Sequence, residues 1–235
     1  PHGFTVTDYR ADATVGGTAS LGGSVDSGTG EQVYTGAVTL TNNVTLTATD
    51  TDTDGEGIDF GNTLTGGTHS LTIVGGAGFF GAASGLGTVI AGHIDTESTF
   101  AATSLTVSGS ADLGGSVTTT GSQSYGAITL TGDVILKATD MAAMIDVTGD
   151  VLGQNTPDGP HSLELDAAGG TTISGALGDG STTGISTVTV TAGNLTAGSI
   201  DITGDLAAAG HDVNSTAGVI DVGGNLAARD VTSVG

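Results

Sequence analysis

The sequence predicts an all-β fold, a parallel β-solenoid with about 20 residues per coil and Gly, Asn and Asp at its corners. Three observations lead to this prediction. The chain repeats itself, short segments alternate apolar residues with Thr or Ser, and 43 of the 235 residues are Gly. Alternation is the period of a half-buried strand, and Gly, Asn and Asp supply the backbone conformations that tight corners need.

A long repeat covers about half of the chain. The segment "LGGSVDSGTGEQVYTGAVTLTNNVTLTATD" from Leu21 matches "LGGSVTTTGSQSYGAITLTGDVILKATD" from Leu113. Both copies continue through an Ile-Asp step and then reach "HSL". We therefore expect a continuous solenoid over residues 16–235, with two repeats of about 90 residues at 21–78 and 113–170.

A finer repeat gives the length of one coil. The segment "AGSIDITGDLAAAG" from Ala197 returns as "AGVIDVGGNLAARD" from Ala217, 20 residues later. This pattern predicts further coils over residues 171–235. Strand alternation is clear in "VTLTNNVTLTAT", "SLTVSGS" and "STVTVTAG", and no segment has an apolar stripe long enough for a stable helix. We expect Val, Ile and Leu inside the coils and Thr outside.

The first 15 residues depart from the repeats. They hold Phe4, Tyr9 and Arg10, and we expect this segment, residues 1–15, to dock against a neighbouring subunit. The open end of a solenoid exposes unpaired strand edges, on which another coil can stack. The sequence therefore predicts a homo-oligomer formed by head-to-tail stacking.

Charge narrows the range of partners. The chain has 3 basic and 25 acidic residues, for a net charge of −22, and it has no Cys. Nucleic acids and anionic membrane surfaces are excluded, because both need clustered Lys and Arg. No apolar run is long enough to span a bilayer. Such an acidic surface keeps a secreted protein soluble, so we expect an extracellular or cell-surface location.

One acidic loop is a candidate metal site. In "TATDTDTDGEGIDFG", carboxylates alternate around a Gly turn, as in the first half of an EF-hand loop, and oxygen ligands of this kind suit Ca²⁺. The bidentate Glu that closes an EF-hand is missing, because Gly61 stands in its place. The second repeat lacks the loop, so it is an extension of a corner. Two interpretations stay open, a solvated acidic turn or a calcium site formed by Asp50, Asp52, Asp54, Glu56 and Asp59.

The histidines give no metal motif. All five are scattered along the sequence without the close spacing of metal ligands. His69 and His161 occupy equivalent places in the two repeats. We expect both to lie at corners and to form hydrogen bonds with their own loops.

A resemblance supports the same fold. The segments "EQVYTGAVTLTNNVTLTATD" and "TTGSQSYGAITLTGDVILKATD" are similar to the repeats of giant secreted bacterial proteins of the filamentous-haemagglutinin and adhesin kind. The resemblance implies a right-handed β-helix, an extracellular location and a role in adhesion or matrix. It implies no particular functional residues.

These observations favour a structural protein that self-assembles into a fibre, sheath or matrix filament. The alternative is an adhesin stalk or passenger that binds surface glycans or proteins. A lyase needs Arg or Lys near the abstracted proton, and a glycoside hydrolase needs aromatic platforms, whereas the chain has three basic residues and no Trp. We therefore expect no enzyme. Rows of Thr-x-Thr on a single face would instead favour ice binding.

Overall fold

The computed structural model describes residues 13–49, 57–154, 160–179 and 184–234. These residues form 25 strands and no helix. Parallel strands stack as a β-solenoid of about 11 turns, roughly 19 residues apart, which confirms the predicted fold class and coil length. The chain divides into two compact units, Pro1–Ser110 and Ala111–Gly235. Within the described ranges, no helix has the length and apolar character needed to cross a bilayer.

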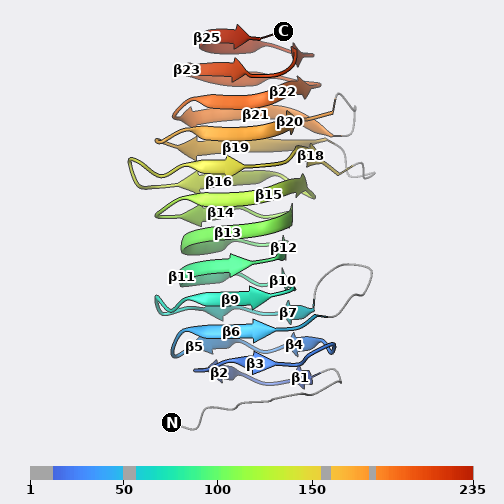
Figure 1. Cartoon of the computed structure of the whole chain (residues 1–235), viewed down its shortest axis with the longest axis vertical. Coiled ribbons are helices and arrows are strands. Elements are labelled where there is room, and N and C mark those ends of the chain that lie inside the picture. The colour runs from blue at the N-terminus through green and yellow to red at the C-terminus, as the bar shows by residue number, and fades with distance from the viewer. Residues whose placement is uncertain (1–12, 50–56, 155–159, 180–183, 235) are drawn as a thin grey trace. The chain divides into compact units, whose positions relative to one another are not determined.

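Unit 1 has three faces, each a ladder of parallel strands (Figure 1). The first face is built from β1 (Ala13–Val15), β4 (Gln32–Tyr34), β7 (Ile58–Phe60), β10 (Gly76–Phe79) and β12 (His93–Thr96). The second contains β2 (Ala19–Leu21), β5 (Val38–Leu40), β8 (Leu64–Thr65) and the starts of β11 (Ala83–Ala91) and β13 (Phe100–Leu113). The third contains β3 (Val25–Asp26), β6 (Val44–Thr47), β9 (Leu71–Val74), the end of β11 and the middle of β13.

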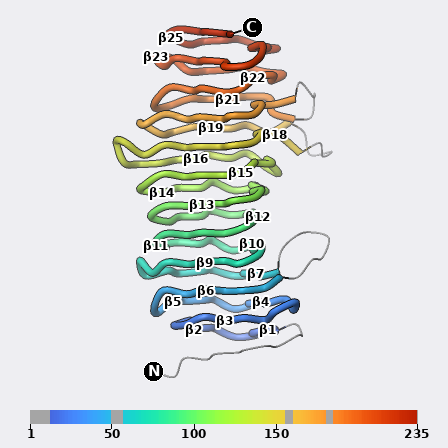
Figure 2. Tube along the Cα trace, viewed as in Figure 1, coloured from blue at the N-terminus to red at the C-terminus, as the bar shows by residue number. Residues whose placement is uncertain are grey.

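Unit 2 also has three ladders of parallel strands (Figure 2). Each face of unit 2 has the number of the face of unit 1 that holds the equivalent residues of the repeat. The third face contains β14 (Val117–Thr119), β16 (Val134–Ala138), β19 (His161–Ala167), β21 (Ile185–Ala192) and the starts of β23 (Leu206–Ser215) and β25 (Leu226–Ser233). The first and second faces share β15 (Gln123–Leu130), β20 (Thr171–Leu177) and β22 (Leu195–Ile202). The first face also holds β17 (Ile145–Val147) and the ends of β23 and β25, and the second holds β18 (Val151–Gly153) and β24 (Ile220–Val222).

The interior follows the predicted alternation. In β16 and β19 every second side chain is buried, and the buried Val134 and Leu136 lie in register with Leu163 and Leu165 of the next coil. Unit 1 adds an aromatic stack in which the ring of Phe60 lies 5.4 Å from that of Tyr34 and 5.1 Å from that of Phe79, nearly parallel to both. Phe100 meets Phe79 edge-on. Aromatic contacts of this kind add to the stabilisation that comes from burial alone.

A buried polar network recurs in both repeats. The side-chain amide of Gln32 donates to the carbonyl of Thr47 (2.8 Å), and the Tyr34 hydroxyl donates to Gln32 Oε1 (3.0 Å). In the second repeat, the side-chain amide of Gln123 donates to the carbonyl of Lys137 (2.9 Å), and the Tyr125 hydroxyl donates to Gln123 Oε1 (2.9 Å). Burial raises the pKa of Tyr34 to about 12, so the hydroxyl stays a donor. Each amide also donates to a carbonyl of the preceding coil, that of Val25 for Gln32 (3.4 Å) and that of Val117 for Gln123 (3.3 Å), and so bridges two coils.

Corner residues link successive coils. Asn43 and Asp133 occupy equivalent positions in the two repeats. Asn43 Oδ1 accepts the backbone N–H of Ser70 (3.0 Å), and Asp133 Oδ1 accepts that of Ser162 (2.8 Å). Asp150, Asn194 and Asp205 bridge coils in the same way. Glycine fills the tightest corners: a Cβ on Gly92 would lie 2.8 Å from the carbonyl oxygen of Gly75, to which the Gly92 N–H donates.

Candidate functional site

The predicted calcium loop lies largely outside the described residues. Asp50, Asp52, Asp54 and Glu56 belong to the undescribed range 50–56, and only Asp59 is described. Asp59 lies in β7, in register with Gly78, which is in turn in register with Asp95. Among the described residues, no group of three or more His, Cys, Asp or Glu side chains could hold a metal ion. The calcium site therefore stays a prediction about the loop itself.

The residues on either side of this loop form the regular hydrogen bonds between successive turns of the solenoid. On the near side, the Thr49 hydroxyl donates to the carbonyl of Gly28 (2.7 Å). On the far side, the N–H of Gly57 donates to the carbonyl of Gly76 (3.2 Å), just before β7 begins. In the second repeat the same corner joins β16 to β17, where the Ala143 N–H closes a short turn onto the carbonyl of Asp140 (3.0 Å). The loop is thus inserted where the chain passes from the third face to the first.

The last described coil of unit 2 leaves its inward side chains uncovered. By register, Leu226 of β25 stacks on Leu206, and Val231 stacks on Val213. Leu206 and Val213 are completely buried, whereas Leu226 is 41% exposed and Val231 is 47% exposed. The alternation that directs these residues inward is therefore intact, but within residues 184–234 no further coil covers them. The result is an apolar surface beside a strand edge.

The first described coil of unit 1 has a comparable apolar surface. A cavity of about 320 Å³ is lined by inward side chains of the first two coils, namely Ala13, Val15, Ala19, Leu21, Val25 and Tyr34, together with the polar groups of Ser27 and Gln32. In the described ranges, β1, β2 and β3 each pair with one strand of the next coil. Both units therefore have a coil whose interior can receive another coil in the same register.

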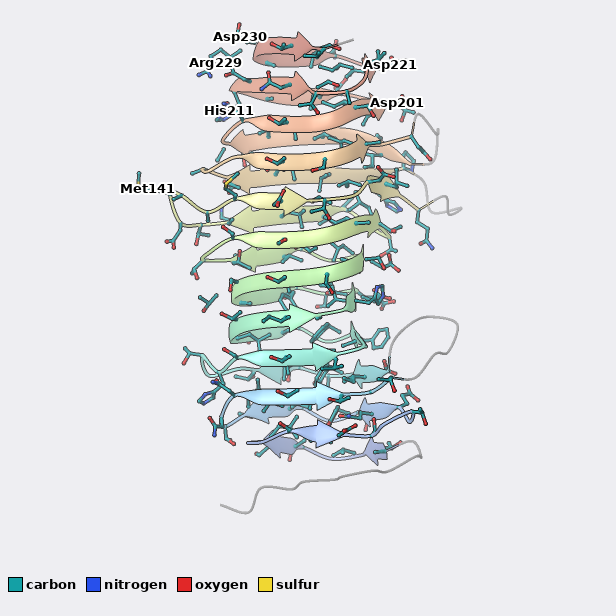
Figure 3. All side chains as sticks on the ribbon, in the orientation of Figure 1. Met141, Asp201, His211, Asp221, Arg229 and Asp230 are labelled. Carbon is teal, nitrogen blue, oxygen red and sulfur yellow. The ribbon has the colours of Figure 1, made fainter. Side chains whose placement is uncertain are left out.

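Acidic residues stack on the outside of the same region of unit 2. Asp201 lies in register with Asp221, and Asp212 with Asp230. Figure 3 shows Asp201 and Asp221 on one side of unit 2, and His211, Arg229 and Asp230 on the other. Arg229 donates to both carboxylate oxygens of Asp212 (2.7 and 2.6 Å).

This two-bond ion pair between consecutive coils changes the titration of both partners. The guanidinium donors of Arg229 hold the pKa of Asp212 below its usual range, and the carboxylate raises the pKa of Arg229. Lys137 and Asp166 form a second inter-coil pair, which raises the pKa of Lys137. Both pairs are exposed, so we expect them to guide register more than to add stability.

The expectation for His161 was wrong. His161 begins strand β19, and its side chain is 5% exposed among the inward residues of that strand. Its Nε2 has no hydrogen-bond partner among the described residues. The alternation from His161 through Ala167 carries this position into the interior, because strand β19 begins at His161 itself. His69 stands before β9, where its backbone N–H donates to the carbonyl of Gly66 (2.9 Å).

Comparison of the chain with family models, curated proteins and solved structures found no match. The likeness to filamentous-haemagglutinin repeats accordingly stays a prediction.

Proposed function

We propose that this chain is an extracellular structural protein whose coils stack end to end into a fibre, sheath or matrix filament, without a catalytic role. The observation that carries the proposal is the residue-for-residue register of consecutive coils, which directs Leu226 and Val231 of the last described coil inward although each is about half exposed. A surface of this kind fits another coil, whether of the same polypeptide or of a second copy.

Because the sequence repeats, consecutive coils present equivalent residues to each other. Asp201 and Asp221, Leu206 and Leu226, and Val213 and Val231 pair residue for residue on consecutive coils. The same register would place Leu226 beneath an apolar residue of an incoming coil. Because the cavity of unit 1 is lined by Ala, Val and Leu, the first coil of a second copy offers apolar partners. The joint would then repeat the packing of the interior.

The energetics favour stacking that is strong but dependent on concentration. Burying a Leu or Val side chain completely stabilises by about 1.5–3 kcal/mol, and a row of inter-strand hydrogen bonds adds to this. Association costs about 4–15 kcal/mol in lost freedom, so both contributions are needed together. The net charge of −22 opposes close approach at low ionic strength. We expect assembly to increase with salt.

Sedimentation velocity over a range of concentrations, with negative-stain electron microscopy, tests the proposal. We expect filaments for the wild-type protein and monomers for Leu226→Asp, because a carboxylate at the joint would be buried without a partner. Ile135→Asp is the matched control, since Ile135 is 40% exposed on the third face of unit 2. Discrete monomeric rods in all three samples would overturn the proposal and favour an adhesin stalk.

Calcium belongs to the same proposal. Repeating the sedimentation with a chelator tests whether the loop at Asp50, Asp52, Asp54, Glu56 and Asp59 holds a metal that assembly needs. Titration calorimetry with Ca²⁺ on wild type and on Asp52→Asn gives a readout independent of assembly. Loss of binding heat in Asp52→Asn would support the site, whereas equal heats in both proteins would favour the solvated turn.

A further inference from the structure

The third face of unit 1 carries outward side chains without charge. It is formed by β6, β9, the end of β11 and the middle of β13, and we call these outward residues the neutral face. They are Thr45, Thr47, Ser70, Thr72, Val74, Thr88, Ile90, Ser104, Thr106 and Ser108. All are Thr, Ser, Val or Ile, in a chain whose net charge is −22.

The register arranges the neutral face as a lattice. Thr45, Thr72, Ile90 and Thr106 form one column across four coils. Thr88 and Ser104 belong to a second column, where the Ser104 hydroxyl donates to Thr88 Oγ1 (3.2 Å). Rows repeat at the strand spacing of about 4.8 Å. Figure 1 shows β6, β9 and β11 lying one above another on this side of unit 1.

Two apolar side chains stand exposed in this lattice, Ile90 in the column of Thr72 and Val74 in the neighbouring column, next to Thr47. Val74 is 45% exposed and Ile90 is 47% exposed. The face ends where charge begins, because Asp26 of β3 lies in register with Thr47. The second face of unit 1 is also uncharged along its strands, but it is narrower. Its strands β5 and β8 each present a single outward Thr, and its β11 segment presents Ser84.

The equivalent face of unit 2 is charged. There the outward residues of β16 and β19 include Lys137, Glu164 and Asp166. Asp133, at the corner before β16, accepts the N–H of Ser162 and keeps a lowered pKa, so it is ionised at neutral pH. A shallow groove on this face is lined by Asp133, Glu164 and Thr189 among others.

We propose that the neutral face of unit 1 packs against the neutral face of a second copy of this chain. The spacing of the rows favours this partner, because a second copy has the same distance between coils and each of its rows can lie against a row of the first copy. Charge points the same way. Two copies at −22 repel each other wherever carboxylates face carboxylates, and the neutral face lets two sheets approach to about 10 Å without that cost.

The size of the contact sets its role. Four coils of strands about 16 Å wide cover about 300 Å² per copy, well below the roughly 800 Å² of a stable pairwise interface. A single contact is therefore transient. In a filament the contact would recur once per copy, and the effective concentration of neighbouring sites would make it persistent. This inference rests on the proposed end-to-end assembly, and it adds lateral pairing of the filaments.

A single cysteine tests the contact, because the chain has no Cys of its own. We expect Thr72→Cys to give cross-linked dimers with a short thiol-reactive cross-linker. Thr189→Cys is the matched control, on the same face of unit 2 but in register with Glu164, and it should give several-fold less dimer. Equal cross-linking at both positions, or none at Thr72→Cys, would overturn the proposal.

Electron microscopy separates this inference from the proposed function. For Ile90→Asp we expect single filaments where the wild type forms pairs, because the substitution adds charge to the neutral face and leaves the coil ends unchanged. Wild-type filaments that are always single overturn the lateral contact alone. Cross-linked Thr72→Cys dimers without filaments overturn end-to-end stacking alone. If Thr72→Cys stays uncross-linked while the wild type arrests ice growth and Ile90→Asp does not, the face binds ordered water and the proposal is wrong.

Discussion

Units 1 and 2 share one sequence repeat, but they differ in the side chains that face the interior and in those that face outward. Unit 1 has an aromatic stack inside and a neutral face outside. In unit 2 the position of Phe60 is taken by Val147, and the position of Thr47 is taken by Lys137, which pairs with Asp166. The backbone ladders and the Gln-Tyr network are the same in both. Inward positions therefore tolerate changes in size, and outward positions set how each unit meets other molecules.

The largest expected effect concerns the interior. Phe60 and Val147 are both completely or almost completely buried at equivalent positions. Phe60→Ala should lower the free energy of unfolding by about 3–5 kcal/mol, because it leaves a cavity between two stacked rings. Val147→Ala removes fewer atoms and should cost roughly 2 kcal/mol. Urea denaturation followed by circular dichroism measures both. Equal losses would show that the aromatic stack adds nothing beyond ordinary apolar packing.

The buried amides should matter equally in both units. Gln32→Leu and Gln123→Leu each leave a buried Tyr hydroxyl without its acceptor, so we expect a loss of about 1–3 kcal/mol in each case. Adding Tyr125→Phe to Gln123→Leu should restore part of the stability, since the unpaired hydroxyl is then removed. The same urea titration applies. A loss in one unit alone would contradict a shared role.

A smaller effect concerns how the two equivalent corners, Asp133 and Asn43, change the pH dependence of stability. The N–H of Ser162 lowers the pKa of Asp133 below its unfolded value near 3.9, so the stabilisation is present above that value and is lost as the pH falls through the folded pKa. Asn43 makes the equivalent bond without a charge. We expect Asp133→Asn to flatten the change in unfolding midpoint between pH 7 and pH 3. Asn43→Asp should steepen it, and identical pH profiles would contradict this account.

The smallest effect is expected at the surface. Lys137→Thr removes the ion pair with Asp166 and restores the residue found in unit 1. Because the pair is exposed, the unfolding midpoint should not change measurably. Combining it with Asp133→Asn, Glu164→Thr and Asp166→Thr should instead create a second neutral face. Cross-linking through Thr189→Cys in that background would then rise toward the level of Thr72→Cys, and no rise would show that charge does not decide which face pairs.

The fold could be predicted from the sequence because the repeat, the alternation and the corner residues are all local patterns. "VTLTNNVTLTAT" alone predicts the buried Val44 and Leu46 and the outward Thr45. The predicted role of Asp and Asn at corners was wrong, because the described residues with a positive φ are eight Gly and Thr68, and none is Asn or Asp. Asn43 and Asp133 bond to residues in the next coil, and the distance along the chain depends on loops of unequal length. No local pattern gives that distance.

The candidate surfaces were harder to predict for the same reason. Thr-x-Thr alternation indicates that Thr45 and Thr72 face outward, but only the register places them in one column with Ile90. The Gln-x-Tyr pattern was present in both repeats as a usable signal, since alternation directs both side chains inward. The position of His161 was missed because strand β19 begins at that residue, and its inward direction depends on pairing with Ile185.

Cryo-electron microscopy of the purified chain tests the central claim most directly. We expect filaments in which the coil spacing of about 4.8 Å continues without interruption across each joint, with the surface of Leu226 and Val231 covered by the first coil of the next copy. The same sample of Leu226→Asp should contain single molecules. Separate wild-type molecules at every concentration and salt condition, with that surface open to solvent, would contradict end-to-end assembly.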